Sequence, residues 1–295
     1  MFRNIFNTFA NCFKIPELKS RILFTAGILA VVRLIAYIGI PGLDHTALAA
    51  FINQNSQNGG GLLGMYNTFA GGAYENCAVG ALGIMPYISA TIILQLMTAV
   101  VPQLSKLARE EGGRAKIIQY GRYLTVLLCI GQGWYFANGW LNPQQQFGQG
   151  FQGQLVLIDN HVWYLIQTVL IMTTGTMLLV WLGEQITERG IGNGVSLVIT
   201  IGIVARLPLA VRGLKDMFHP AGGEAVHHVM GDGILLLILL AGVIGGVIAV
   251  TQAQRKIPVQ YASRMVGQKM YQGGTNYMPL RVNYSGVMPI IFAQS

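Results

Sequence analysis

Six apolar runs long enough to cross a lipid bilayer dominate the sequence, and they restrict its fold more than any other feature. A membrane-spanning α-helix needs about 20 mostly apolar residues. The runs cover residues 22–40, 78–101, 123–140, 161–182, 194–211 and 233–250. Charged residues make up 10% of the chain and hydrophobic residues 53%, so a soluble domain could not cover this apolar surface, and disorder is excluded as well. The sequence therefore predicts an all-α, polytopic membrane helix bundle.

A seventh apolar run begins at Gly286 and reads GVMPIIFAQS up to Ser295. These ten residues are too few to span a bilayer, and no helix stop signal follows them. We therefore expect the sequence to be the front part of a longer chain, cut within its seventh helix. The first run begins near residue 22 and has spanning length, so we expect it to be a retained helix and not a cleaved signal peptide.

Lysine and arginine are concentrated in alternate connections between the apolar runs. One set of connections, including the N-terminal segment 1–21, carries 15 of them, and the other set carries 3. The connection at 251–285 alone has five and no acidic residue. The positive-inside rule then places the N-terminus in the cytoplasm, and the net charge of +8 reports orientation and not a DNA-binding surface. The exception is the connection after the fifth run, where Arg206, Arg212 and Lys215 gather on the outer side.

Enzyme motifs are absent from the sequence. It contains no HExxH, no P-loop and no GxSxG, and no pair of carboxylates lies inside a run. We interpret His219, His227 and His228 as polar loop residues and not as a metal site. The sequence therefore predicts no catalytic residue, no cofactor and no metal, and it offers no nucleophile–base pair for a membrane-embedded enzyme.

Ionisable residues are nearly absent from the middle of the runs. Arg33 is the clear exception, and we expect a structural pairing with a helix end, a carbonyl or a lipid head group. Glu184 and Glu188 are expected to be solvated at the cytoplasmic end of the fourth run. A small-solute secondary transporter would need ionisable groups or broken helices at the midplane, so this class is disfavoured.

Proline, asparagine and glycine residues indicate where some of the predicted helices begin or are interrupted. Pro86 is expected to break the hydrogen-bond ladder of the second span, and Asn193 is a plausible N-cap of the fifth. Segment 62–76 is apolar but too short to span, and it contains Gly71, Gly72 and Glu75. It is either an interfacial stretch or a re-entrant segment, which is tolerated only where it lines a cavity or is buried in protein.

Four long motifs resemble the SecY family, the channel subunits of the bacterial Sec protein translocase. They are GALGIMPYISATIILQL at 80–96, WLGEQITERGIGNGVSL at 181–197, QRKIPVQYASR at 254–264 and YMPLRVNYSGVMPIIFAQS at 277–295. The resemblance implies ten spanning helices in two inverted halves around a pore. It divides the chain into a cytosolic segment 1–21, a first half 22–211 with five helices, and the start of the second half, 212–295, with helix 6, the basic loop 251–285 and part of helix 7.

The resemblance also assigns roles to residues by motif position. The pore ring of aliphatic side chains maps onto Ile84, Ile88, Val195, Ile199 and Ile291, with Val195 where isoleucine is common. A plug that seals the pore from outside maps onto segment 62–76, with Leu62, Leu63, Met65, Tyr66, Asn67, Phe69, Gly71 and Gly72. The lateral gate maps onto Pro86, Ser89, Thr91, Ile92, Gln95 and Pro289. The surface that docks the motor ATPase SecA or the ribosome maps onto Arg255, Lys256 and Arg264.

The function that the resemblance implies is conduction of unfolded secretory polypeptides across the bacterial plasma membrane and lateral release of membrane-protein helices into it. Expected partners are the SecE and SecG subunits, SecA, the ribosome, unfolded preproteins with their signal sequences, and membrane lipids, but not DNA. The alternatives are a SecY fragment without independent activity and, much less favoured, a small-solute secondary transporter.

Overall fold

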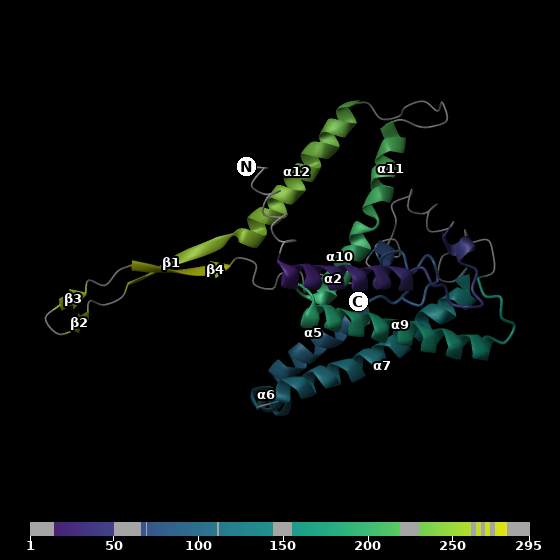
Figure 1. Ribbon diagram of the computed structural model, residues 1–295, viewed down its shortest axis with the longest axis horizontal. Coiled ribbons are helices and arrows are strands. Elements are labelled where there is room, and N and C mark those ends of the chain that lie inside the picture. Colours follow the sequence, from purple (N-terminus) through teal and green to yellow (C-terminus); the bar gives the residue numbers. More distant parts are fainter. Residues whose placement is uncertain are drawn as a thin grey trace. The chain divides into compact units, whose positions relative to one another are not determined.

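The computed structural model describes residues 15–49, 66–68, 70–110, 112–143, 155–218, 230–260, 264–266, 269–271 and 275–281. The chain divides into two compact units, one ending at Ala210 and one running from Val211 to Gln294 (Figure 1). The helices of the first unit are α2 (Pro16–Ile35), α5 (Met85–Val100), α6 (Pro102–Arg109), α7 (Gly113–Leu141), α9 (His161–Arg189) and α10 (Gly194–Val204). Helix α11 (Leu207–Phe218) crosses the boundary, and α12 (Met230–Gln252) belongs to the second unit.

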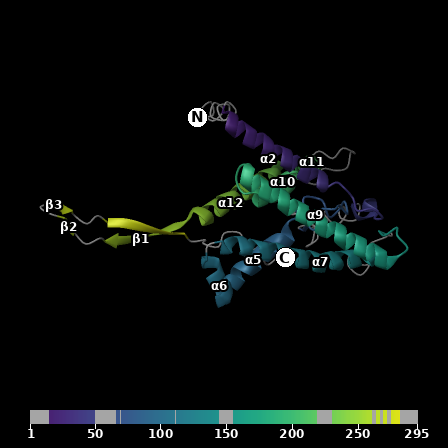
Figure 2. The same ribbon diagram turned by 60° about the horizontal axis from the view of Figure 1, so that its bottom comes forward.

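Helix α9 is the centre of the first unit, since it contacts α2, α5, α7 and α10 (Figures 1 and 2). Glycines permit these contacts. A Cβ at Gly133 of α7 would lie 3.7 Å from the Cα of Val169 on α9, and one at Gly183 of α9 would lie 3.6 Å from the backbone nitrogen of Val195 on α10. Small residues let helix backbones approach closely in membranes, so the bundle is built around them.

Three helical stretches of the described residues are long and apolar enough to cross a membrane: α9, residues Gly194–Lys215 of α10 and α11, and Gly233–Gln252 of α12. The pair α5 and α6, bent by 101°, would make a fourth as one broken span. Helix α2 does not meet the criterion for a spanning helix because it carries the charged residues Lys19, Arg21 and Arg33. Helix α7 does not meet it because polar residues such as Gln132 and Asn138 lower its mean hydropathy. The predicted run at 22–40 is helical only as far as Ile35, whereas the run at 123–140 lies within α7.

Two predicted spans differ from the helices in the structure. Residues 78–84 form turns, with Gly83 at φ +60°, and α5 begins only at Met85. Pro86 lies in the first turn of α5, where its missing N–H costs nothing, so the expectation that it breaks a helix ladder is wrong. The predicted run 194–211 is divided at Ala205 and Arg206, and Pro208 stands in the first turn of the following helix.

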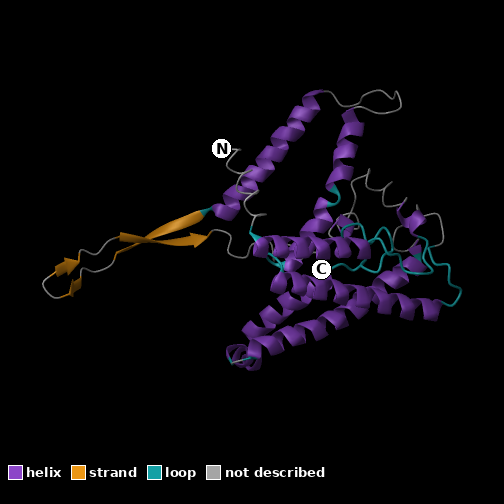
Figure 3. Cartoon of the chain, in the orientation of Figure 1, coloured by secondary structure: helices purple, strands orange, loops and turns teal. Residues whose placement is uncertain are grey.

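The basic connection at 251–285 is not a simple loop (Figure 3). Strand β1 (Gln254–Gln260) pairs antiparallel with β4 (Thr275–Arg281), and β2 (Arg264–Val266) pairs with β3 (Lys269–Tyr271). The sequence predicts only a basic loop here, and the strands form because residues such as Ile257, Val259 and Tyr277 favour the extended backbone. We call this element the basic ribbon, residues 254–281.

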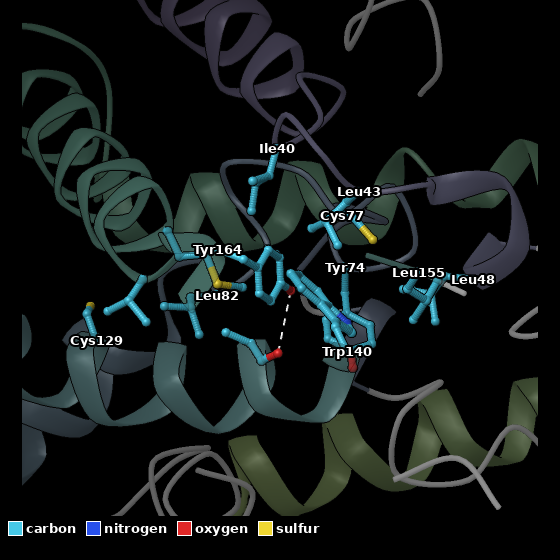
Figure 4. Packing of buried hydrophobic residues seen from close by; sticks show 14 residues of the cluster. Ile40, Leu43, Leu48, Tyr74, Cys77, Leu82, Cys129, Trp140, Leu155 and Tyr164 are labelled. Atoms are coloured by element: carbon cyan, nitrogen blue, oxygen red, sulfur yellow. Dashed lines mark hydrogen bonds between the residues drawn. The ribbon is translucent and has the colours of Figure 1, made fainter. Parts of the chain in front are cut away.

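A buried aromatic core holds one end of the first unit together (Figure 4). Tyr74, Trp140 and Tyr164 have no exposed surface. The rings of Tyr74 and Trp140 lie 5.7 Å apart, and Phe136 lies 5.2 Å from Tyr74. The Tyr164 hydroxyl donates to the carbonyl of Ala137 at 3.5 Å, so it joins α9 to α7. Burial of such rings dominates core energetics, and this cluster fixes the segment that carries Tyr74.

Candidate functional site

The segment of residues 70–84 is non-helical and enters between the helices of the first unit. Backbone hydrogen bonds pair it with the residues that follow α2: Val79 N–H donates to Ile38 O at 2.9 Å, and Ile40 N–H donates to Cys77 O at 2.8 Å. Gly71 and Gly72 have φ of +68° and +87°, a region that other residues rarely adopt. We call residues Ala70–Ala73 the glycine turn.

An ion pair ties the segment after the glycine turn to the end of α10. Arg206 Nη2 lies 2.7 Å from Glu75 Oε1, and the two side chains are only 25% and 19% exposed. The other carboxylate oxygen of Glu75 accepts a hydrogen bond from Asn67 Nδ2 at 2.7 Å. In return the backbone N–H of Glu75 donates to Asn67 Oδ1 at 3.2 Å, and Asn67 is fully buried. Both oxygens of this carboxylate are therefore satisfied.

A second arginine contacts the glycine turn from α2. Arg33 Nη1 donates to the carbonyl oxygen of Gly71 at 3.0 Å, and its guanidinium lies 5.7 Å from the ring centre of Tyr37. A carbonyl partner is one of the structural pairings predicted for this residue. A Cβ at Gly71 would lie 2.7 Å from Arg33 Nη1 and 3.0 Å from the Cα of Gly202, so only glycine fits between α2 and α10 here.

A small cavity of about 30 Å³ lies beside the glycine turn, enough for about one water molecule. Its walls come from α2, the glycine turn, the start of α5, α9 and α10, and include Arg33, Ala70, Ile84, Leu179, Ile199 and Gly202. Two residues of the predicted pore ring, Ile84 and Ile199, thus line the same cavity. Ile84 precedes α5 and is 5% exposed.

The other predicted ring residues lie elsewhere. Ile88 is buried one turn further along α5, 7% exposed, and does not line this cavity. Val195 is half-buried and its Cγ2 would lie 3.7 Å from a Cβ on Gly183, so it packs toward α9. Ile291 lies outside the described residues, as does Pro289 of the predicted lateral gate.

Four of the predicted plug residues are described. Tyr66 donates its hydroxyl to the carbonyl of Leu82 at 3.2 Å, and its ring packs on Tyr74 at 5.7 Å. Asn67, Gly71 and Gly72 take part in the contacts given above. Leu62, Leu63, Met65 and Phe69 lie outside the described residues.

The predicted lateral-gate residues on α5 have different environments. Pro86, Ser89 and Ile92 are buried, and Gln95 is exposed. Ser89 donates its hydroxyl to the carbonyl of Met85 at 3.1 Å, and Thr91 donates to that of Ile88 at 2.8 Å. These bonds satisfy both hydroxyls within the helix, so neither requires a partner from another helix.

The predicted docking residues lie on the basic ribbon. Arg255 and Lys256 are exposed on β1, opposite Leu280 and Pro279 of β4, and Arg264 pairs with Tyr271 at the far end. The ribbon therefore presents cations on an extended, two-stranded support.

Sequence reasoning missed two ion pairs. Glu184 was expected to be solvated, but it accepts two hydrogen bonds from Arg122 at 3.2 and 2.7 Å, which joins α9 to α7. The pair of Glu75 and Arg206 was also missed, although both carried a signal. Glu75 is an acid in an otherwise apolar segment, and Arg206 is a cation on the side expected to lack them. Within the described ranges, no group of three or more potential metal ligands gathers.

Comparison with known proteins places this architecture. A family model described as SecY matches residues 78–295. The chain is 43% identical over 291 residues to the protein translocase subunit SecY of Streptomyces scabiei, covering 97% of this chain and 64% of that relative. It thus spans less than two thirds of the length of this relative.

Solved structures agree in fold. One, described as the structure of a protein conducting channel, superposes with a TM-score of 0.60 at 17% identity, covering 93% of this chain and 55% of that one. Another superposes with a TM-score of 0.58 at 17% identity, over 92% of this chain and 54% of that one, and its description says that the plug domain of SecY stabilises the closed state of the translocation channel. The fold is therefore that of a membrane-embedded channel bundle, and the protein is a membrane protein. The chain belongs to the SecY family.

Proposed function

We propose that this chain is the central part of a protein-conducting channel that moves unfolded secretory polypeptides across the bacterial plasma membrane, with its N-terminus in the cytoplasm. The observation that carries the proposal is the cavity beside the glycine turn, which both Ile84 and Ile199 line. A closed channel needs an apolar constriction on its path and a cover over it. Ile84 and Ile199 have the apolar chemistry for the constriction, and the glycine turn next to them would belong to the cover.

The aliphatic ring acts as a gasket in this proposal. Branched apolar side chains exclude water and ions by dewetting, yet they make no specific bond to a passing polypeptide. Ile84 and Ile199 would act with Ile88, Val195 and Ile291. The segment 62–76 would be the plug that covers the ring in the resting state.

The ring makes a measurable prediction. Replacing Ile84 with serine removes about 1.5–3 kcal/mol of apolar burial, so the population of the wetted state should rise by roughly ten- to a hundredfold. We expect a corresponding rise in resting ion conductance of the channel in planar bilayers. Leu127→Ser, at a 66% exposed position of α7, is the control and should leave conductance at the wild-type level. Equal conductance of Ile84→Ser and wild type would contradict the gasket.

Lateral release of membrane helices into lipid is the second activity that we propose. The gate would include Pro86, Ser89, Thr91, Ile92, Gln95 and Pro289. The exposed end of α5, with Gln95 and Leu96, supports this assignment because a client helix can reach it from the bilayer. Partition into lipid would be driven by apolar burial, about 25 cal/mol per Å².

The basic ribbon would dock the partner that drives transport, SecA or the translating ribosome. The chain would contribute no catalysis of its own, and SecE and SecG would complete the complex. Arg255, Lys256 and Arg264 offer cations to an anionic surface such as ribosomal RNA, whose contacts are salt-sensitive.

Charge reversal tests this docking surface. The double variant Arg255→Glu with Lys256→Glu should weaken ribosome or SecA binding by roughly tenfold or more. It should also reduce the salt dependence of the affinity, because fewer phosphate contacts form and fewer counterions are therefore released on binding. The matched control is Arg212→Glu with Lys215→Glu, which makes the same charge change on α11. Equal affinities of the two variants in a sedimentation assay would refute docking at the ribbon.

A further inference from the structure

We propose that Asn67, Glu75 and Arg206 form a polar latch that holds the glycine turn shut and sets the resting leak of the channel. The inference rests on the proposed channel function and deepens it, because it assigns the resting seal to charged residues as well as to the aliphatic ring. The latch is named here for these three residues.

The latch joins the segment of residues 70–84 to the C-terminal end of α10. Arg206 follows the last turn of α10, where a cation is favoured by the carbonyl end of the helix. Its partner Glu75 follows the glycine turn closely, and Asn67 precedes it. The side chains of Arg206 and Glu75 are three-quarters or more buried, so their 2.7 Å ion pair is screened less than an exposed one.

The glycine turn packs closely against the latch. A Cβ at Gly72 would lie 3.0 Å from Glu75 Oε1 and 3.3 Å from Arg206 Nη2. On the same turn, Gly71 touches Gly202 of α10 and accepts a hydrogen bond from Arg33 of α2. Arg33 of α2 therefore bonds the turn directly, and Arg206 at the end of α10 bonds Glu75, two residues after the turn.

The position of the latch decides what it controls. Ala70, Ala73 and Gly202 line the cavity together with Ile84 and Ile199. Movement of the turn would therefore remove one wall of this cavity and admit water. The neighbouring aromatic residues differ from the latch, because ring contacts hold Tyr66 and Tyr74 in the apolar core.

A charge-exchange experiment tests the latch. Glu75→Gln and Arg206→Gln each remove the ion pair, and each should raise the resting conductance of the full channel complex in planar bilayers by about tenfold, a coupling typical of residues in direct contact. The exchanged double variant, Glu75→Arg with Arg206→Glu, should return conductance toward the wild-type level. Arg122→Gln is the matched control, because it removes an ion pair of the same 2.7 Å length between α7 and α9 that does not touch the turn.

The outcomes separate a specific latch from general loosening of the bundle. Unchanged conductance in both single variants overturns the latch, and so does an exchanged variant that leaks as much as the two single variants or more. A rise with Arg122→Gln equal to that with Arg206→Gln also overturns it, because loss of any interhelical ion pair would then suffice. Failure of the channel function itself is distinct: Ile84→Ser would then leave conductance unchanged, and no preprotein would cross in any variant.

Discussion

Replacing Gly175 with alanine is expected to lower the free energy of unfolding by about 3 kcal/mol, the upper range for overpacking a close contact. Gly175 is buried on α9, against the segment that leads into α5. An added Cβ would collide with the carbonyl oxygen of Val79 and would lie 2.8 Å from its carbonyl carbon. Backbone cannot turn aside as a flexible side chain can, so the segment would have to move.

Thermal unfolding in detergent measures this effect. A thiol-reactive dye reports unfolding here because Cys77 and Cys129 are free and buried in the folded chain. The control is Gly131→Ala on α7, where an added Cβ meets no described atom within 4 Å. Alanine is the better helix former, so the control should be stable or slightly stabilised. A midpoint for Gly175→Ala as high as that of the control would refute the close contact.

Replacing Trp140 with alanine is expected to cost about 3–5 kcal/mol, the usual range for deleting a buried aromatic side chain. Trp140 is fully buried, and its ring packs on Tyr74. The cavity left behind would be enclosed by α7, α9 and the segment of Tyr74, which the other rings hold in place, so it could collapse only in part.

The same helix provides the control for this substitution. Trp134 lies on α7 but is 57% exposed, and Trp134→Ala should cost less than about 1 kcal/mol. The dye assay should then separate the two variants clearly. Similar midpoints would mean that the aromatic core contributes little stability. Because Tyr74 stands one residue before Glu75, Trp140→Ala should also loosen the latch and raise the resting leak.

These predictions divide the proposed seal into parts of different chemistry. The aromatic core anchors the segment that carries Tyr74 by apolar burial, and this segment cannot leave the core unless the core unfolds. The latch is polar, and its groups can be hydrated again when the glycine turn opens. A seal that opens and closes repeatedly needs this combination, since an entirely apolar cover would open only at the cost of exposing a large apolar surface.

The sequence by itself determined the properties that depend on neighbours along the chain. The apolar runs predicted helices at α9 and α12 because a spanning helix satisfies its backbone internally, whatever it packs against. Asn193 was predicted as an N-cap, and its side chain accepts a hydrogen bond from Ser196 N–H at 3.3 Å, because capping is decided within one turn. Family membership, too, was readable from four local motifs.

Tertiary structure alone decided the contacts between distant segments. The late start of α5 follows from turns at 78–84 that pair with the chain after α2, which the hydropathy of that run does not reveal. The ribbon at 254–281 depends on strand pairing across its own ends. The meeting of Glu75 with Arg206 depends on packing of α10 against α2 and α9. An ion pair leaves no periodic trace in a sequence, so only the folded chain shows which acid meets which base.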